Sequence, residues 1–120
     1  MKFAKLVPNI FYKDIKCGVK TFVDCLEFTI GHDEMNSEHP FCVLEKNGLR
    51  VNLFQDEKHA VEHSPEFRLV TDDIEEVYER VKSKYPKLLH PNLSVITLRP
   101  WGAKEFALMD GQIGIVIQKW

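Results

Sequence analysis

The chain has 120 residues, a length that fits one compact domain, residues 1–120, and is too short for two ordinary ones. Hydrophobic residues make up 44% and charged residues 28%, which excludes a disordered, collagen-like or membrane-embedded chain. The formal net charge of −2 gives no general attraction to nucleic acids or anionic membranes, so neither is expected as a partner.

Cysteine usage and the N-terminal sequence indicate the compartment. Cys17, Cys25 and Cys42 cannot all pair within the chain, and they form no Cys-x-x-Cys motif. Pro8 and the polar residues after it interrupt the apolar residues that an export signal would need. The longest apolar run is far shorter than the roughly 20 residues that cross a bilayer. We therefore expect reduced thiols and a cytoplasmic protein.

The first half of the chain predicts a βαβββ module over about residues 1–58. Leu6 to Tyr12 suit a strand, and Asp14 caps a helix with apolar residues at helical spacing. After a mixed stretch that contains Phe28 to Ile30, the polar run Gly31 to His39 is typical of a loop or a frayed strand. Two strands are then predicted at Phe41 to Glu45 and Leu49 to Gln55. Between these two, Asn47-Gly48 indicates a tight hairpin turn.

The second half, about residues 64–120, predicts the same module. Glu66 to Thr71 form a strand, and Asp73 caps a helix with Glu76 completing a capping box. Three strands follow, with Asp110-Gly111 as the turn between the last two; we place them at Leu93 to Arg99, Glu105 to Met109 and Gln112 to Trp120.

The two modules can be aligned on each other. Asp14 and Asp73 are 59 residues apart, and the two hairpin turns, Asn47-Gly48 and Asp110-Gly111, are 63 apart. These offsets match Val7 with Glu66 in the first strands and Asn52 with Ile115 in the last strands. A duplicated unit restricts the possible architectures more than any single motif does, and it predicts an α+β fold.

The chain resembles the vicinal oxygen chelate superfamily, which includes glyoxalases, extradiol dioxygenases and bleomycin-resistance proteins. The resemblance covers nearly the whole chain, and its strongest part is Arg99-Pro-Trp-Gly-Ala-Lys-Glu-Phe-Ala-Leu-Met-Asp110-Gly111. Asp14-Ile15 and Asp73-Ile74 after the first strands carry it more weakly. The resemblance implies the glyoxalase/bleomycin-resistance fold, in which curved sheets enclose a cleft, and it is nearest to the bleomycin-resistance-like members.

Metal-dependent members of the superfamily place a His, Gln or Glu ligand at four equivalent points, which fall here on Val7, Asn52, Glu66 and Ile115. Two of these side chains cannot coordinate a metal, whereas a catalytic site needs about three protein ligands. The sequence therefore predicts no metal and no other cofactor. His59 and His63 have the spacing of a two-His pair, but they fall in Asp56 to Ser64, which we expect to be a charged loop. Solvated surface histidines are therefore favoured.

Strand alternation predicts which side chains face the cleft. If the matched positions do so, the ligand-binding residues of the strands are Asn9, Phe11, Arg50, Asn52, Phe54, Glu66, Arg68 and Ile115. Trp101 joins them because it matches the Trp-Gly loop that lines the groove in bleomycin-resistance proteins. Two alternatives stay open: Glu66 and Arg68 could simply pair with each other, and Trp101 could belong to the core or to a dimer interface.

We interpret the sequence as a bleomycin-resistance-like homodimer that binds a small organic molecule, flat and partly apolar, without a metal in a cleft shared by two subunits. Glu66 is expected to be its most informative residue, in a poorly solvated position. One alternative is a lyase, isomerase or dioxygenase of the same fold with a non-standard site, whose catalytic residues the sequence does not name. Another is a dimeric interaction module.

Overall fold

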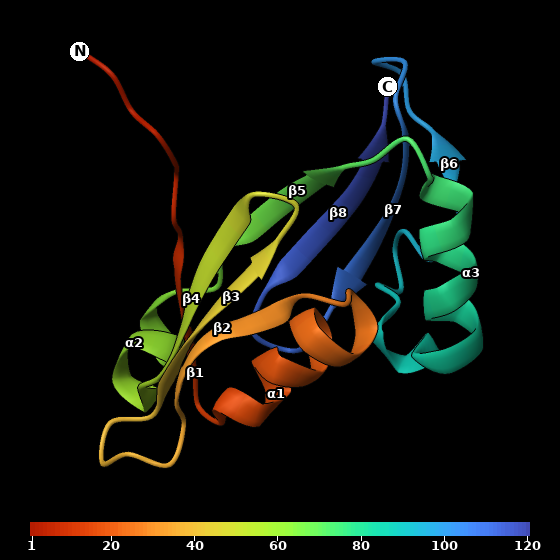
Figure 1. Cartoon of the computed structure of the whole chain (residues 1–120). Helices are drawn as coiled ribbons and strands as arrows, with labels where there is room; N and C mark the ends of the chain where they lie inside the picture. Colours follow the sequence, from red (N-terminus) through yellow and green to blue (C-terminus); the bar gives the residue numbers. More distant parts are fainter. The chain divides into compact units, whose positions relative to one another are not determined.

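The computed structural model describes residues 1–120, which divide into two compact units, Met1–His63 (unit 1) and Ser64–Trp120 (unit 2). Each unit contains one four-stranded sheet with helices, as Figure 1 shows. The predicted pair of βαβββ modules in an α+β protein is therefore present. No helix has both the length and the apolar character that crossing a membrane requires.

Unit 1 has the strand order β1-β4-β3-β2, with β1 parallel to β4 and the other neighbours antiparallel. The Asp14 carboxylate accepts a hydrogen bond from the Lys16 main chain at 3.0 Å and caps the first helix, as the sequence predicts. The elements are β1 (Asn9–Tyr12), α1 (Ile15–Val19), the π-helix η1 (Lys20–Cys25) that continues it, β2 (Thr29–Glu34), β3 (Phe41–Lys46), β4 (Leu49–Gln55) and α2 (Glu57–Glu62).

Two predictions for unit 1 are wrong in detail. The first strand begins at Asn9 and not at Leu6, because Pro8 has no N–H to donate to a sheet. The segment around His59, expected to be a loop, contains helix α2. Asp56 caps this helix by accepting a hydrogen bond from the His59 main chain at 3.1 Å, and the buried Ala60 anchors it.

Unit 2 repeats the arrangement with the order β5-β8-β7-β6, in which β5 is parallel to β8. Asp73 begins the main helix as predicted but makes no side-chain cap, because its ψ of 44° is not the extended conformation that capping needs; the predicted capping box is absent. The elements are β5 (Glu66–Val70), α3 (Ile74–Lys84), the 3₁₀-helix η2 (Pro86–Leu88), β6 (Thr97–Leu98), β7 (Lys104–Met109) and β8 (Gly114–Lys119).

The strand predicted from Leu93 to Arg99 is much shorter in the structure, because only Thr97 and Leu98 pair with β7. Arg99 already turns back, donating its main-chain N–H to the Ala103 carbonyl at 2.8 Å. Earlier in the segment, the Leu93 carbonyl accepts a hydrogen bond from Ala107 at 2.8 Å. The segment thus follows the edge of the sheet without continuous pairing.

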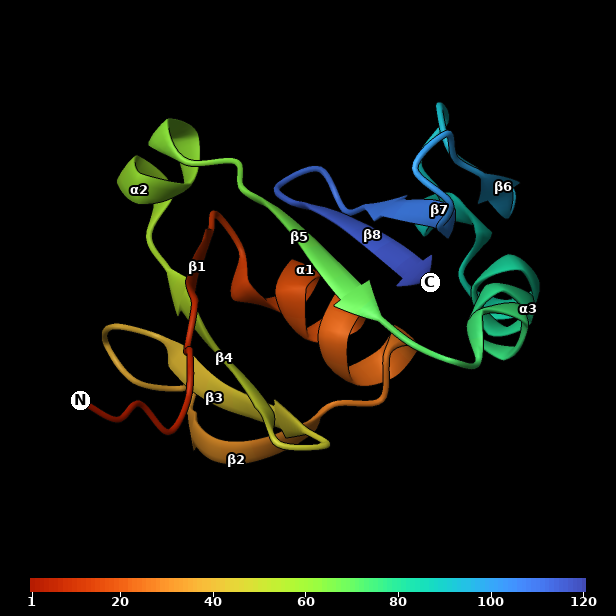
Figure 2. The same cartoon turned by 90° about the horizontal axis from the view of Figure 1, so that it is seen from above.

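In each unit the main helix, α1 with η1 in unit 1 and α3 in unit 2, packs against one face of the sheet (Figure 2). In unit 1 the short helix α2 lies beside the edge strand β1. In unit 1 the helix face carries the buried Ile10, Leu44 and Leu53, together with Cys42, whose pKa burial and the nearby Asp33 raise to about 11. In unit 2 the Tyr78 ring of α3 packs edge-on against Phe106, with ring centroids 5.1 Å apart. The opposite face of each sheet is available to carry a site.

Candidate functional site

The open face of the unit 1 sheet carries a row of aromatic rings. The strand register places Phe54 opposite both Phe41 and Phe11, so their rings stack with centroids 5.8 and 5.5 Å apart. Helix α2 adds His59, whose ring stacks on Phe11 at 4.8 Å. We call these four residues, Phe41, Phe54, Phe11 and His59, the aromatic strip. The three phenylalanines are half-buried, so part of each ring is open to a partner.

The position of His59 is fixed by Asp56. The carboxylate of Asp56 lies 2.8 Å from His59 Nδ1 and also accepts the main-chain hydrogen bond that caps α2. Hydrogen bonds from the main chain and the ring of His59 lower the pKa of Asp56. The aromatic strip therefore ends on an imidazole held in one orientation by a carboxylate.

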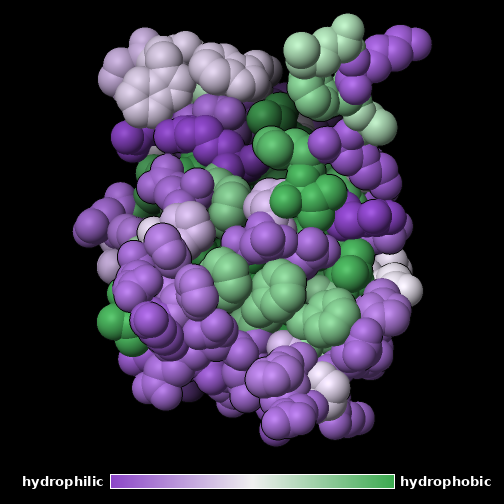
Figure 3. Space-filling view, turned by 90° about the vertical axis from the view of Figure 1, so that its left-hand side faces the viewer, coloured by the Kyte–Doolittle hydropathy of each residue, from purple (hydrophilic) through white to green (hydrophobic).

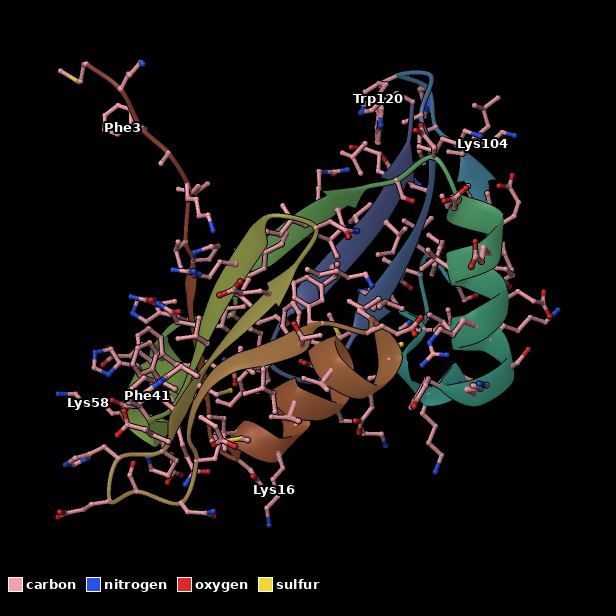
Figure 4. All side chains as sticks on the ribbon, in the orientation of Figure 1. Phe3, Lys16, Phe41, Lys58, Lys104 and Trp120 are labelled. Atoms are coloured by element: carbon pink, nitrogen blue, oxygen red, sulfur yellow. The ribbon has the colours of Figure 1, made fainter.

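The side of unit 1 that carries Phe41 exposes apolar side chains next to hydrophilic ones. Figure 4 places Phe41 and Lys58 on the same side of unit 1, and this side faces the viewer in Figure 3. There, apolar side chains gather in the middle of the view and continue toward its upper edge, with hydrophilic ones beside and below them. Apolar surface next to polar groups is typical of a surface that receives an organic ligand.

The structure brings together four of the residues predicted in this half. Asn9 and Asn52 are register partners, and Asn52 Nδ2 donates to Asn9 Oδ1 at 3.0 Å beside the Phe11 and Phe54 pair. The fifth, Arg50, lies on the same face of β4 but donates to Glu45 Oε1 at 2.9 Å. Its guanidinium is therefore already engaged within the sheet.

Unit 2 carries a hollow of about 330 Å³ on the open face of its sheet. Residues of β5, β7 and β8 and of the segments that precede β5 and flank β6 line it. Arg68, Arg99 and Glu66 bring charge to the lining, and Leu93, Ala107 and Val116 bring apolar surface.

A buried carboxylate organises the charges of this hollow. The side chain of Glu105 is only 2% exposed, and its Oε2 accepts hydrogen bonds from Arg68 Nη1 at 3.0 Å, Trp101 Nε1 at 2.9 Å and Gln118 Nε2 at 2.6 Å. Arg99 Nε lies 3.8 Å from Oε1, and the Arg99 guanidinium lies over the Trp101 ring at 4.8 Å. We call these five residues the Glu105 cluster.

The cluster keeps Glu105 ionised. Burial alone raises the pKa of a carboxyl group, but the hydrogen bonds from Trp101 and Gln118 and the charges of Arg68 and Arg99 outweigh it. The net effect is a lowered pKa for Glu105. The negative charge of the cluster is thus buried, while Arg68 remains 46% exposed at the hollow.

Glu66, the residue expected in a poorly solvated position, is in fact 63% exposed at its side chain. Its Oε1 lies 3.8 Å from Arg68 Nη2, which is an ion-pair distance without a hydrogen bond. The well-buried carboxylate of this face is Glu105. Trp101 is 49% exposed and joins Arg68 through their shared acceptor, so the predicted Arg68 and Trp101 do lie together.

Ile115 is among the residues that line the hollow, but its side chain lies on the other face of the sheet from those of Glu66 and Arg68. It is in register with Phe67, whereas Glu66 pairs with Gly114 and Arg68 with Val116. The predicted alignment matched the first residues of the two hairpin turns. In the structure the second loop, between Met109 and Gly114, has two more residues than the first loop, between Lys46 and Leu49. The loop centres are thus 64 residues apart, and a one-residue error moves a side chain to the opposite face.

Glu105, Gln118 and Arg99 were missed by the sequence reasoning. Glu105 and Gln118 are polar residues that, with one terminal lysine each, interrupt the apolar sequence of β7 and β8, and in the structure they are register partners. That pairing was the available signal, since two polar groups buried opposite each other must satisfy one another. For Arg99, the signal was only its place beside the Trp-Gly pair.

The donor set does not fit a metal centre of the usual kind. A catalytic metal needs about three protein ligands, and no group of three or more His, Cys, Asp or Glu side chains comes together in the chain. Of the four points matched with superfamily ligands, Val7 precedes β1 and Ile115 faces away from Glu66.

Comparison with solved structures identifies the fold. A bleomycin-binding protein in complex with bleomycin is 20% identical, with a TM-score of 0.71 over 98% of this chain and 99% of that one. TioX from Micromonospora sp. ML1 is 14% identical, with a TM-score of 0.77 over 98% of each chain. A member of the glyoxalase/bleomycin resistance protein/dioxygenase superfamily from Sphaerobacter thermophilus DSM 20745 is 14% identical, with a TM-score of 0.70 over 100% and 98%.

No protein-family model and no curated protein sequence matches the chain. The structural matches extend over nearly the whole length of both partners, so the chain has the glyoxalase/bleomycin-resistance fold. The predicted fold is confirmed.

Proposed function

We propose that this protein binds a small, flat and partly apolar organic molecule, in the manner of a bleomycin-resistance protein and without a metal cofactor. The observation that carries this proposal is the aromatic strip of unit 1, which is half-buried, bordered by the Asn9 and Asn52 amides and open on one side. Stacked rings with a few polar groups at their edge suit a planar ligand.

The hollow of unit 2 supports the proposal from a second position. Its volume of about 330 Å³ lies at the lower end of ligand sites, and its lining combines charged and apolar groups. Among proteins of the same fold, one is solved in complex with bleomycin, which shows that this fold can serve a binder of an organic molecule. We include both modules in one functional domain, residues 1–120, with Asn9, Phe11, Asn52, Phe54, Arg68 and Trp101 as its principal ligand contacts.

We also propose that the protein works as a homodimer. Met1, Phe3 and Leu6 are each more than 80% exposed in an extended N-terminal segment (Figure 4), and so much apolar surface favours association with a second copy. Light scattering at micromolar concentration should give twice the 14.0 kDa of one chain. A single species of 14.0 kDa contradicts the dimer.

Two measurements test ligand binding itself. Native mass spectrometry of gently purified protein should reveal an added small-molecule mass that denaturation removes. NMR titration with 2-naphthol, a flat neutral probe, should shift signals of Phe11 and Phe54. Phe54→Leu should weaken the binding of 2-naphthol by about three- to tenfold, which is the scale of one aromatic contact. Phe3→Leu, on the N-terminal segment, should leave the affinity unchanged.

Absence of both a bound mass and any naphthol-dependent shift contradicts the proposal and favours an interaction module. Stoichiometric zinc, nickel, iron or manganese in elemental analysis, lost together with an enzymatic reaction on chelation, favours the alternative of a metal-dependent enzyme.

A further inference from the structure

The two guanidinium groups of unit 2 and their buried counter-charge decide which chemistry the hollow presents. Arg68 and Arg99 both border it and are 46% and 34% exposed at their side chains, whereas Glu105 is 2% exposed. A molecule entering the hollow therefore meets two guanidinium groups and the exposed carboxylate of Glu66, while the carboxylate of Glu105 lies beneath the surface.

The Arg68 guanidinium has N–H donors that no residue of the chain accepts. Its guanidinium carries five N–H groups, and Nη1 donates to Glu105 Oε2 at 3.0 Å. No other hydrogen bond involves the Arg68 side chain; its second neighbour is Glu66 Oε1, 3.8 Å from Nη2. An exposed ion pair of that length contributes little, so a better placed anion can displace Glu66.

Glu105 cannot serve as the acceptor of an incoming cation. Its Oε2 already accepts three hydrogen bonds, from Arg68, Trp101 and Gln118, and Arg99 stands 3.8 Å from Oε1. With 2% of its side chain exposed, the carboxylate is closed to an incoming group, and its Oε2 holds the Arg68 guanidinium. Since a planar guanidinium held in one orientation pairs with a carboxylate through two parallel hydrogen bonds, the fixed Arg68 is suited to that partner.

We propose that the hollow of unit 2 binds the carboxylate of an amphiphilic organic acid, with the acid on Arg68 and its apolar part against Leu93, Ala107 and Val116. These three side chains line the same hollow as the guanidinium. The inference rests on the proposed function and narrows its ligand class. Arg68 is the contact residue, and Glu105 is a positioning residue that holds the Arg68 side chain.

The experiment compares three probes of one shape: 4-phenylbutyrate, the neutral 4-phenylbutyramide and the cationic 4-phenylbutylamine. Each is titrated by NMR into the full chain, and the signals of Arg68, Ala107 and Gly114 are followed. The carboxylate should bind about tenfold more tightly than the amide, as a charge-assisted pair requires, and the amine should bind weakest.

Two variants and a control locate the effect. Glu66→Gln removes the competing carboxylate and should tighten the binding of 4-phenylbutyrate by about threefold, which is the scale of an exposed ion pair. Arg68→Lys keeps the positive charge but loses the paired N–H donors of the guanidinium. It should reduce the preference for carboxylate over amide to less than about threefold. Glu75→Gln, which changes the net charge equally on exposed α3 outside the hollow, should leave all three affinities unchanged.

An amine that binds better than the carboxylate, or a Glu66→Gln variant that weakens 4-phenylbutyrate, overturns this inference while the proposed function stands. Binding of none of the three probes at unit 2 also overturns it. The proposed function is then judged by 2-naphthol on the aromatic strip, which is a separate measurement on other residues.

Discussion

The two sheets share one topology and differ in what their open faces carry. In unit 1 the central pair Phe41 and Phe54 is aromatic, whereas in unit 2 the pair Glu105 and Gln118 is buried and polar. Both pairs lie between the two central antiparallel strands of their sheets. The duplicated framework thus fixes where side chains gather, and the residues themselves decide whether a face stacks a ring or holds a charge.

The comparison also holds for the ion pairs. Arg50 and Glu45 in unit 1 are 38% and 41% exposed, so water competes with their 2.9 Å hydrogen bond. Glu105 in unit 2 is 2% exposed and accepts three hydrogen bonds. Ion pairs of similar residue types should therefore contribute unequally to the free energy of unfolding.

The largest effect is expected from Glu105→Gln. The change leaves Arg68, Trp101 and Gln118 without their charged acceptor, and it should lower the free energy of unfolding by about 3 kcal/mol. Glu45→Gln, the matched change in unit 1, should lower it by less than about 1 kcal/mol because that pair is exposed. Urea unfolding at pH 7 measures both; equal losses contradict the distinction between the two faces.

A smaller effect is expected where the helix of unit 1 approaches its sheet. A Cβ at Gly18 would lie 2.5 Å from the Tyr12 ring and 2.8 Å from Leu53, so Gly18→Ala should lower the free energy of unfolding by about 1 to 3 kcal/mol. At Gly114 in unit 2 the nearest atom would be 3.7 Å away, and Gly114→Ala should stay within about 0.5 kcal/mol. Thermal unfolding of the two variants compares them, and the reverse order contradicts the packing described for α1.

The smallest effect is a pH dependence. Because the pKa of Glu105 is lower in the folded protein than its ordinary value of 4.5, its contribution is complete above that value and is lost as the pH falls through the native pKa. The wild type should therefore lose more stability between pH 7 and pH 3 than Glu105→Gln does. Urea midpoints at a series of pH values report the difference, and parallel curves for the two proteins contradict it.

Local signals in the sequence predicted most of the fold. Asp14 caps its helix, and Asn47 and Gly48 have positive φ values of 52° and 81°, which their residue types favour. Asp110-Gly111 predicted a turn in the right place but not its length. There the Asp110 carboxylate accepts main-chain hydrogen bonds from Gln112 and Ile113 at 2.9 and 3.0 Å, which builds a longer loop and moved Ile115 to the other face.

The candidate site was less predictable because its contacts are distant in sequence. Glu105 and Arg68 are 37 residues apart, and no local pattern announces that they meet. Phe11 and Phe54 were found because strand alternation identifies a face, but their stacking on His59 depends on helix α2, which was expected to be a loop. Alternation predicts which face a residue occupies and not which carboxylate on that face is buried.

One NMR experiment tests the central claim, which is that the open faces of the two units differ in the organic groups they bind: a flat apolar ring in unit 1 and a carboxylate in unit 2. The ¹⁵N-labelled protein is titrated separately with 2-naphthol and with 4-phenylbutyrate, at pH 7 where the second probe is ionised. The account predicts that 2-naphthol moves the signals of Phe11, Phe54 and His59 most, and that 4-phenylbutyrate moves those of Arg68, Ala107 and Gly114 most. The account is contradicted if both probes shift the same set of signals, or if neither probe shifts any signal.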